Sequence, residues 1–153
     1  MIYSRNAFTM IELIFVIVIL GILAAVAIPK LAATRTDAEV SKMAQNIMTS
    51  AAEISTYAMS KAVTDSDFTV MSNAMENMQK SGDANLSSNK AEIKAGTVLD
   101  CITVSVDVND TAGTDTLNVI MEDANGDSQC LALQGAIDEN KYPMKLRGTN
   151  VSY

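Results

Sequence analysis

The apolar residues of the chain follow three patterns, and the first is an almost unbroken run from Phe8 to Ile28. A helix over this run would reach roughly 32 Å, enough to cross a hydrocarbon core of about 30 Å. Glu12 is the one acid in the run, and no polar side chain occurs between Leu13 and Ile28. A carboxylate in a membrane span costs about 3 kcal/mol, so it should have a partner or a function. We therefore interpret residues 8–29 as a membrane-spanning helix with a functional acid; an acid that merely reaches the membrane edge is the alternative.

A second apolar pattern, with steps of three and four residues, predicts that this helix continues. Pro29 lies between the two patterns, and it lacks the N–H that would bond the Ala25 carbonyl, so we expect the helix to bend or loosen there without stopping. The simplest interpretation is one helix from about Phe8 to Lys61, whose second half (residues 30–61) packs one stripe against a head (residues 62–153). The stripe comprises Val40, Met43, Ala44, Ile47, Ala51, Ile54 and Ala58.

A short helix and a loop are expected next. Asp65-Ser66-Asp67 supplies acceptors and negative charge at a helix start, and Gly82 would end this helix. Residues 81–96 are rich in Ser, Asn and Lys, which predicts a connecting loop with one helical turn at Lys90–Lys94. The apolar stripe of the short helix is Phe68, Met71, Met75 and Met78.

The third pattern has a period of two, begins at Thr97 and predicts β-structure. Strands are expected over residues 98–108, 117–121 and 128–133, with a tight turn at Asn125-Gly126 before the third. The head should therefore contain an antiparallel meander at about residues 97–133. Together with the long helix, this predicts an α+β fold in which a long N-terminal helix packs on a small antiparallel sheet.

Composition excludes several classes of function. The chain has 18 acidic and 11 basic residues, a net charge of −7 and no histidine. A negative surface repels the phosphate backbone, which disfavours nucleic acid as a partner. Without histidine the commonest general base and metal ligand is missing, and no glycine-rich nucleotide motif occurs. We therefore expect a protein that is not an enzyme and needs no cofactor.

Asp123, Asn125 and Asp127 alternate like the first oxygen ligands of a calcium loop. An EF-hand loop also needs a glycine after the third ligand and a later glutamate, whereas here Gly126 precedes Asp127. An Asn-Gly pair forms a turn without a metal. A plain turn is the favoured interpretation, and these three residues are the candidate calcium ligands.

The two cysteines, Cys101 and Cys130, lie 29 positions apart. This spacing fits neither a CxxC redox pair nor a zinc cluster. In an oxidising compartment an even pair is typical of one disulfide, and two buried free thiols are the alternative. The predicted meander conflicts with a disulfide, because its outer strands would lie about 9.6 Å apart. Either Cys130 lies where its segment leaves the sheet, or the strand order differs.

Residues 1–7 carry one cation, Arg5, and no acid. In an ordinary secretory signal the small-residue cleavage site follows the apolar region, whereas here the small residue Ala7 precedes it. Cleavage of the Ala7–Phe8 bond would leave the apolar helix on the mature protein and create an amine at Phe8. That amine would lie about one helical turn from Glu12, since residues four apart share a helix face.

These residues resemble the leader and helix start of type IV pilins and of the pseudopilins of type II secretion. The likeness covers about the first 30 residues and rests on the short basic leader, Phe8-Thr9-Met10-Ile11-Glu12, Gly21 and Pro29. It implies that a prepilin peptidase cleaves between Ala7 and Phe8, that Phe8 is N-methylated, and that Glu12 acts in assembly. Glycine weakens a helix interior and proline removes one of its hydrogen bonds, so Gly21 and Pro29 also predict a flexible stretch between them. The chain departs from the family at Ala7, where glycine is usual.

The resemblance implies a structural subunit of a type IV pilus or a type II secretion pseudopilus, polymerised through its apolar helix. Its partners would be copies of itself, other pilins or pseudopilins, the prepilin peptidase, membrane lipid and an inner-membrane assembly platform with an ATPase motor. It would begin as a single-pass precursor in the bacterial inner membrane with a periplasmic head, and end in a periplasmic or extracellular filament. Calcium is the one cofactor that the resemblance allows. A minor tip subunit and a monomeric, membrane-anchored ligand-binding head are the alternatives.

Overall fold

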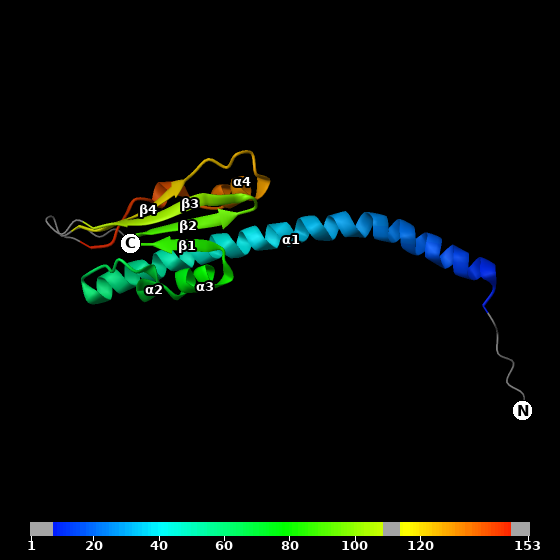
Figure 1. Ribbon diagram of the computed structural model, residues 1–153, viewed down its shortest axis with the longest axis horizontal. Coiled ribbons are helices and arrows are strands. Elements are labelled where there is room, and N and C mark those ends of the chain that lie inside the picture. The colour runs from blue at the N-terminus through cyan, green and yellow to red at the C-terminus, as the bar shows by residue number, and fades with distance from the viewer. Residues whose placement is uncertain (1–7, 109–113, 148–153) are drawn as a thin grey trace, which may run out of the picture. The chain divides into compact units, whose positions relative to one another are not determined.

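A computed structural model describes residues 8–108 and 114–147 (Figure 1). The described elements include five strands, which form one antiparallel sheet. A long N-terminal helix precedes the sheet, so the predicted α+β class is confirmed. In chain order, the elements are α1 (Met10–Lys61), α2 (Phe68–Met71), α3 (Asn73–Ser81), β1 (Ala84–Ser87), β2 (Lys90–Ala95), β3 (Val98–Asp107), β4 (Thr116–Met121), α4 (Ser128–Gly135), the 3-10 helix η1 (Glu139–Lys141) and β5 (Met144–Lys145).

Helix α1 spans 52 residues and contains Pro29, so the proline does not end it. It begins at Met10 rather than Phe8, and the Thr9 carbonyl accepts the first backbone hydrogen bond, from the Leu13 N–H at 3.3 Å. It ends at Lys61 as predicted, where Ala62 takes a positive φ of 55° that cannot continue a right-handed helix.

The chain divides into two compact units, Met1–Asp37 and Ala38–Tyr153, and α1 contributes its first part to one and its second part to the other. The second unit has a continuous core built on one stripe of α1, in which alanines alternate with larger side chains. Alanine lets neighbouring elements approach the helix closely, while the branched side chains fill the space between them. The buried residues of this stripe are Val40, Ala44, Ile47, Ser50, Ala51, Ile54 and Ala58.

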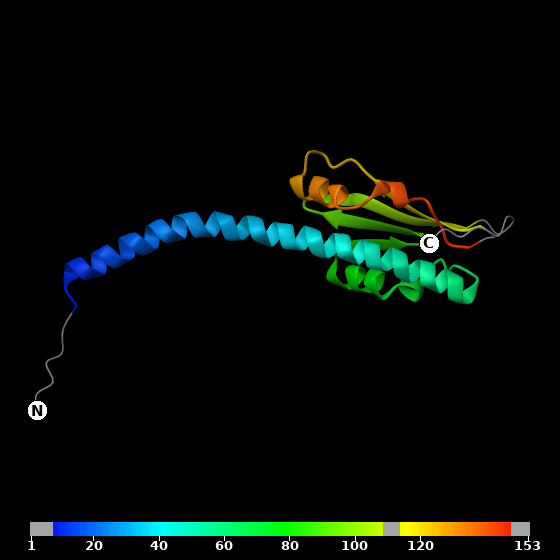
Figure 2. The same ribbon diagram turned by 180° about the vertical axis from the view of Figure 1, so that it is seen from behind.

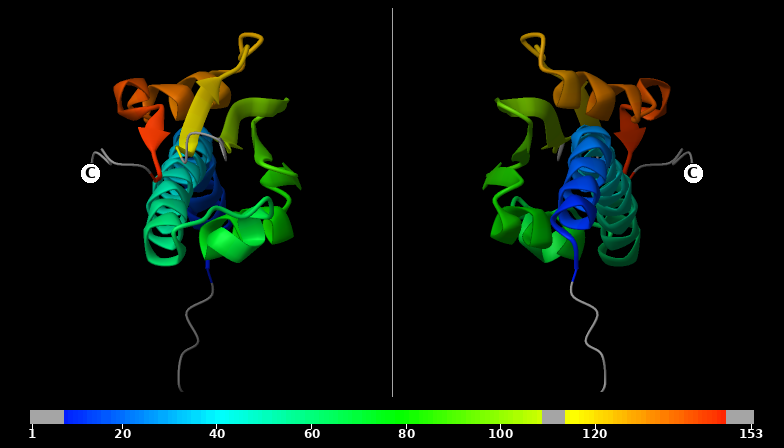
Figure 3. Two further views of the ribbon diagram at one scale, coloured as in Figure 1. Left: turned by 90° about the vertical axis from the view of Figure 1, so that its left-hand side faces the viewer. Right: turned by 90° about the vertical axis from the view of Figure 1, so that its right-hand side faces the viewer.

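Each strand of the sheet pairs with the next in sequence, giving the order β1-β2-β3-β4-β5. Ile93 lies opposite Ile102, and Val104 lies opposite Val119, so apolar pairs run across the central strands. The end-on views in Figure 3 show the sheet curving around the second part of α1. Helix α4 lies on the face of the sheet away from α1, whereas α2 and α3 lie beside α1 next to β1 (Figures 1 and 2).

The loop predicted for residues 81–96 is wrong, because this segment forms the β1–β2 hairpin. Its inward residues Ala91, Ile93 and Ala95 alternate with polar ones, and small alanines weakened the apolar signal. Asn89 takes a positive φ of 58° at the turn, which asparagine tolerates well.

The third strand predicted at residues 128–133 is also wrong, because this segment is helix α4. Asp127 caps the helix: its Oδ1 accepts from the Gln129 and Cys130 N–H groups at 2.9 and 3.1 Å. Asn125 and Gly126 do form a turn, with φ of 49° and 78°, but it joins β4 to α4. Of the described strands, β3 and β4 lie within residues 97–133, and β1, β2 and β5 lie outside that range.

The predicted second helix is divided at Ser72. The Ser72 hydroxyl accepts from the Met75 N–H at 3.1 Å and donates to Glu53 of α1 at 2.6 Å. This starts α3 and ties it to α1. Gly82, with φ of 80°, ends α3 as predicted.

An ion pair between a buried carboxylate and a partly exposed arginine joins the C-terminal segment to the start of β4. Asp115 is fully buried, and its Oδ2 lies 2.7 Å from Arg147 Nε. The Thr64 hydroxyl donates to the same oxygen at 2.8 Å, and Arg147 Nη1 donates to the Ala62 carbonyl at 3.3 Å. These bonds hold the residues after α1 against the sheet.

Candidate functional site

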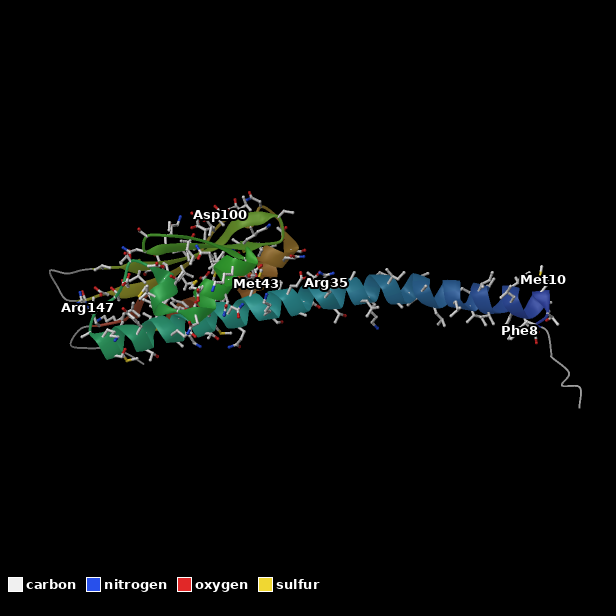
Figure 4. All side chains as sticks on the ribbon, turned by 60° about the horizontal axis from the view of Figure 1, so that its bottom comes forward. Phe8, Met10, Arg35, Met43, Asp100 and Arg147 are labelled. Carbon is white, nitrogen blue, oxygen red and sulfur yellow. A yellow bond between two sulfur atoms is a disulfide. The ribbon has the colours of Figure 1, made fainter. Side chains whose placement is uncertain are left out.

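The first part of α1 is an apolar helix with its side chains exposed on every side. Figure 4 shows these side chains standing out around the helix between Met10 and Arg35. None of this apolar stretch is buried. Among the described residues, α1 is the one helix long and apolar enough to cross a membrane. An exposed surface of this kind favours burial in lipid or against other apolar helices.

Thr9 and Glu12 form a capping box at the start of α1. Glu12 Oε2 accepts from the Thr9 backbone N–H at 2.9 Å and from the Thr9 hydroxyl at 2.7 Å. In return, Thr9 Oγ1 accepts from the Glu12 backbone N–H at 3.3 Å. The pair satisfies donors that a helix start leaves without intrahelical partners, and it places negative charge at the positive end of the helix dipole.

Sequence reasoning missed Thr9 as a partner of Glu12. The signal was present, because Ser or Thr followed three residues later by Glu before an apolar run is the capping-box pattern. The predicted pairing of Glu12 with a Phe8 amine concerns the cleaved chain and stays a prediction. Ala7 and the rest of the leader lie outside the described residues.

Gly21 and Pro29 both lie inside α1. A Cβ built on Gly21 would meet no atom within 4 Å, so nothing in this structure requires glycine there. After Pro29, the Thr34 hydroxyl donates to the Lys30 carbonyl at 2.9 Å. Back-bonding of this kind is common where helices bend. Flexibility between Gly21 and Pro29 stays a prediction.

The predicted disulfide between Cys101 and Cys130 is present, with the two Cα atoms 5.6 Å apart and both residues fully buried. The conflict with the meander disappears because Cys130 lies on α4 rather than on a third strand. Gln134 strengthens the junction: its side-chain amide donates to the carbonyls of Cys101 and Glu122 at 2.9 and 2.7 Å. The disulfide thus fixes α4 to β3.

Asp127 makes a second link between α4 and the sheet. Its Oδ2 accepts from the Thr97 backbone N–H at 2.9 Å and from the Thr97 hydroxyl at 2.8 Å, while Oδ1 caps α4. These donors favour the ionised form, and they lower the pKa of Asp127 to about 2, with the Thr97 bonds as the largest cause. Gly96 makes the approach possible, because a Cβ there would lie 2.3 Å from Asp127 Oδ1.

The candidate calcium ligands serve backbone groups in this structure. Asp123 Oδ1 accepts from the Asn125 N–H at 2.8 Å, and both Asp127 oxygens are bonded as described above. Within residues 8–108 and 114–147, no group of three or more His, Cys, Asp or Glu side chains could hold a metal ion. Asp123 Oδ1 and both Asp127 oxygens therefore already have local partners, and calcium binding stays a prediction.

Residues 3–28 match the sequence model of the prokaryotic N-terminal methylation motif. The match includes Thr9, Glu12 and the apolar run that continues as α1. The comparisons with curated proteins and with solved structures found no match. The motif is characteristic of type IV pilins and pseudopilins and points to a structural protein. The chain therefore carries, at the start of its long helix, a methylation motif that supports a type IV pilin-like or pseudopilin precursor.

Proposed function

We propose that the chain is a filament subunit of a type IV pilus or a type II secretion pseudopilus, polymerised through the first part of α1. The observation that carries the proposal is the coincidence of the methylation motif with an apolar helix exposed on every side. A monomeric protein that used this helix only as a membrane tether would also need an apolar helix, but it would not need the methylation motif.

Processing comes first in the proposed pathway. A prepilin peptidase would cleave the Ala7–Phe8 bond and methylate the new amine at Phe8. Mass spectrometry of the mature N-terminus tests this step, and we expect a chain that begins with methylated Phe8. A chain beginning after Ala25 or Ala27 would show cleavage as an ordinary secretory signal instead. Ala7→Gly should be processed at least as fully, because both residues are small.

Assembly would exchange one apolar environment for another. In the membrane the exposed side chains of α1 contact lipid, and in a filament neighbouring α1 helices would cover them. Both environments remove the same surface from water, so the exchange can be nearly balanced in free energy. An inner-membrane assembly platform with an ATPase motor would then set its direction. The second unit would lie in the periplasm before assembly and on the filament afterwards.

The Gly21–Pro29 stretch is proposed as the flexible part of the helix. Glycine weakens a helix interior, and proline removes one of its hydrogen bonds. In assembled filaments, backbone amides of residues 22–28 should exchange with solvent faster than those of residues 40–54. Equal protection of both segments would show one rigid helix.

Crosslinking distinguishes a polymerised filament subunit from a monomeric protein that is anchored in the membrane by its helix. Single cysteines placed in the first part of α1, on a background that keeps the native disulfide, should yield ladders of crosslinked subunits in filament preparations. Cells lacking the assembly ATPase provide the control and should yield no ladder. A protein that stays monomeric in the membrane would overturn the filament proposal, while rare copies among other subunits would indicate a minor tip subunit.

A further inference from the structure

Asn85-Leu86-Ser87 is an Asn-x-Ser triplet that filament assembly does not use. A triplet of this type, with any residue except proline in the middle, is the acceptor sequence for N-linked glycosylation. Such triplets also arise by chance, so their position in the fold matters. Two others begin at Asn109 and Asn150 and lie outside the described residues.

Strand β1 presents the two chemically required side chains to solvent. It lies at the edge of the sheet, and Asn85 and Ser87 share one face because alternate residues of a strand point the same way. Both are exposed, whereas Leu86 between them points the other way and packs against the core. A bulky group on Asn85 would therefore leave the core undisturbed.

The hydrogen bonds of the Asn85 amide also allow substitution. Nδ2 donates to Glu92 Oε2 over a long 3.4 Å, and an amide nitrogen carries two hydrogens, one of which remains after a glycan is attached. Glu92 keeps a second partner, since its Oε1 accepts from Lys90 Nζ at 2.8 Å. Loss of the long bond would thus leave no carboxylate unpaired.

A cavity of about 230 Å³ lies beside the Asn85 amide. Glu92 and Lys94 line it with groups that can bond sugar hydroxyls. Leu99 adds an apolar surface that is 70% exposed, which can contact the C–H face of a sugar ring. The cavity therefore offers both kinds of contact that a pyranose ring makes.

We propose that Asn85 is an N-glycosylation site and that the first sugar lies in this cavity. The donor is a sugar carried on a polyprenyl diphosphate. Asn85 Nδ2 forms a bond to the anomeric carbon, the bond from that carbon to the diphosphate oxygen breaks, and the lipid diphosphate leaves with the electron pair. One amide proton is released, and nothing is oxidised or reduced. The transfer requires export of the second unit, so the inference rests on the proposed function.

Intact-mass and peptide mass spectrometry of the protein purified from its own cells tests the inference. The wild type and Ser87→Thr, which keeps the acceptor sequence, should carry a sugar mass on the peptide that contains Asn85. Asn85→Gln and Ser87→Ala should lose that mass completely. Thermal unfolding of both variants, compared with enzymatically deglycosylated wild type, checks that the fold is kept.

The N-terminal peptide in the same spectra separates this inference from the proposed function. Phe8 at the N-terminus with an unmodified Asn85 overturns the glycosylation site and leaves the filament proposal standing. An unprocessed and unmodified chain overturns both. A sugar mass found only on the peptides of Asn109 or Asn150, or one that persists in Ser87→Ala, also overturns the assignment to Asn85.

Discussion

The Thr9 hydroxyl and the Thr9 backbone N–H donate to the same oxygen of Glu12, at 2.7 and 2.9 Å. Glu12 therefore stabilises the first turn of its own helix within a single chain. The capping that the structure shows and the proposed pairing with a Phe8 amine have different requirements. Capping needs a hydrogen-bond acceptor, whereas pairing with a Phe8 amine needs a negative charge.

Thr9→Val should loosen the start of α1. The change removes the hydroxyl that caps the Glu12 N–H, and loss of an N-cap hydroxyl costs about 1 kcal/mol of helix stability. The amides of Glu12 and Leu13, which donate to the Thr9 hydroxyl and carbonyl, should then exchange roughly fivefold faster in hydrogen-exchange measurements on the full-length protein in detergent. Thr9→Ser keeps the hydroxyl and is the matched control. Unchanged exchange in Thr9→Val would show that the capping box contributes nothing measurable.

Glu12→Gln should lower filament yield while the second unit stays as stable as in the wild type. Glutamine can still accept a hydrogen bond in a capping box, so the start of α1 is kept while the charge is lost. In the proposed filament the Glu12 charge pairs with the Phe8 amine of a neighbouring subunit, and glutamine loses this pairing. A subunit inserted at another height leaves the charge buried and unpaired, which costs several kcal/mol, so the charge also selects the assembly geometry. Glu12→Leu removes both properties and should insert in the membrane at least as well, yet assemble poorly. Filament yields equal to the wild type in both variants would show that the acid is only tolerated.

Sequence patterns predicted the long helix and the central strands because their signals are dense. The apolar run is long and unbroken, and the stripe from Val40 to Ala58 repeats at steps of three and four residues, which only a helix places on one face. Strand β3 is rich in β-branched residues, which favour strands. The β1–β2 hairpin was missed because Ala91 and Ala95 face the core, and alanine carries little apolar signal. Helix α4 was missed because Cys130, Leu131 and Leu133 fit a short strand as well as a helix.

Contacts between segments that are far apart in the chain could not be predicted from sequence patterns. The capping function of Asp127 could be suspected from its place before α4, but nothing in the sequence shows that Thr97 donates to the same carboxylate. The ion pair of Asp115 and Arg147 likewise joins segments that are far apart in the sequence. The disulfide was predictable because an even pair of cysteines in an oxidising compartment indicates one whatever the strand order. The role of Glu12 in assembly stays a prediction.

Reduction of the Cys101–Cys130 disulfide should lower the melting temperature of the second unit. The bond joins residues 29 apart, and a loop of that size gives roughly 3–4 kcal/mol in the chain-entropy model. For a unit of this length the shift should be roughly 10–15 °C. The double variant Cys101→Ala/Cys130→Ala should melt at a similarly low temperature without reductant and should not respond to it. Free thiols in freshly isolated, alkylated wild type would contradict the prediction.

Asp127→Asn should destabilise the second unit near neutral pH and make little difference in strong acid. The pKa of Asp127 is about 2 in the folded protein, below its ordinary value of 3.8. A lowered pKa stabilises the fold above the unfolded value, and the contribution is lost as the pH falls through the folded value. The difference in melting temperature between wild type and variant should therefore be greatest above about pH 4 and shrink toward about pH 2. A difference that does not change with pH would show that the charge is not what stabilises the link.

Thr97→Ala provides an independent readout of the same link. The Thr97 hydroxyl is the second-largest cause of the lowered pKa, after the Thr97 backbone N–H. The variant removes the hydroxyl and keeps the N–H, so the pKa of Asp127 should rise part of the way toward 3.8. Carboxyl chemical shifts followed by NMR through an acid titration measure this directly. An unchanged titration would mean that the hydroxyl bond is not formed in solution.

Gly96→Ala and Gly82→Ala separate backbone strain from steric conflict. Both glycines have a positive φ, 58° at Gly96 and 80° at Gly82, so alanine at either position costs about 1 kcal/mol in backbone strain. A Cβ at Gly82 would meet nothing within 4 Å, whereas a Cβ at Gly96 would lie 2.3 Å from Asp127 Oδ1. Gly96→Ala must therefore displace the Asp127 carboxylate and weaken its bonds to Thr97. We expect Gly96→Ala to lower the melting temperature clearly more than Gly82→Ala, and to raise the pKa of Asp127, which Gly82→Ala should leave unchanged. Equal loss of stability in the two variants, with the Asp127 titration unaltered, would show that the carboxylate moves aside without consequence.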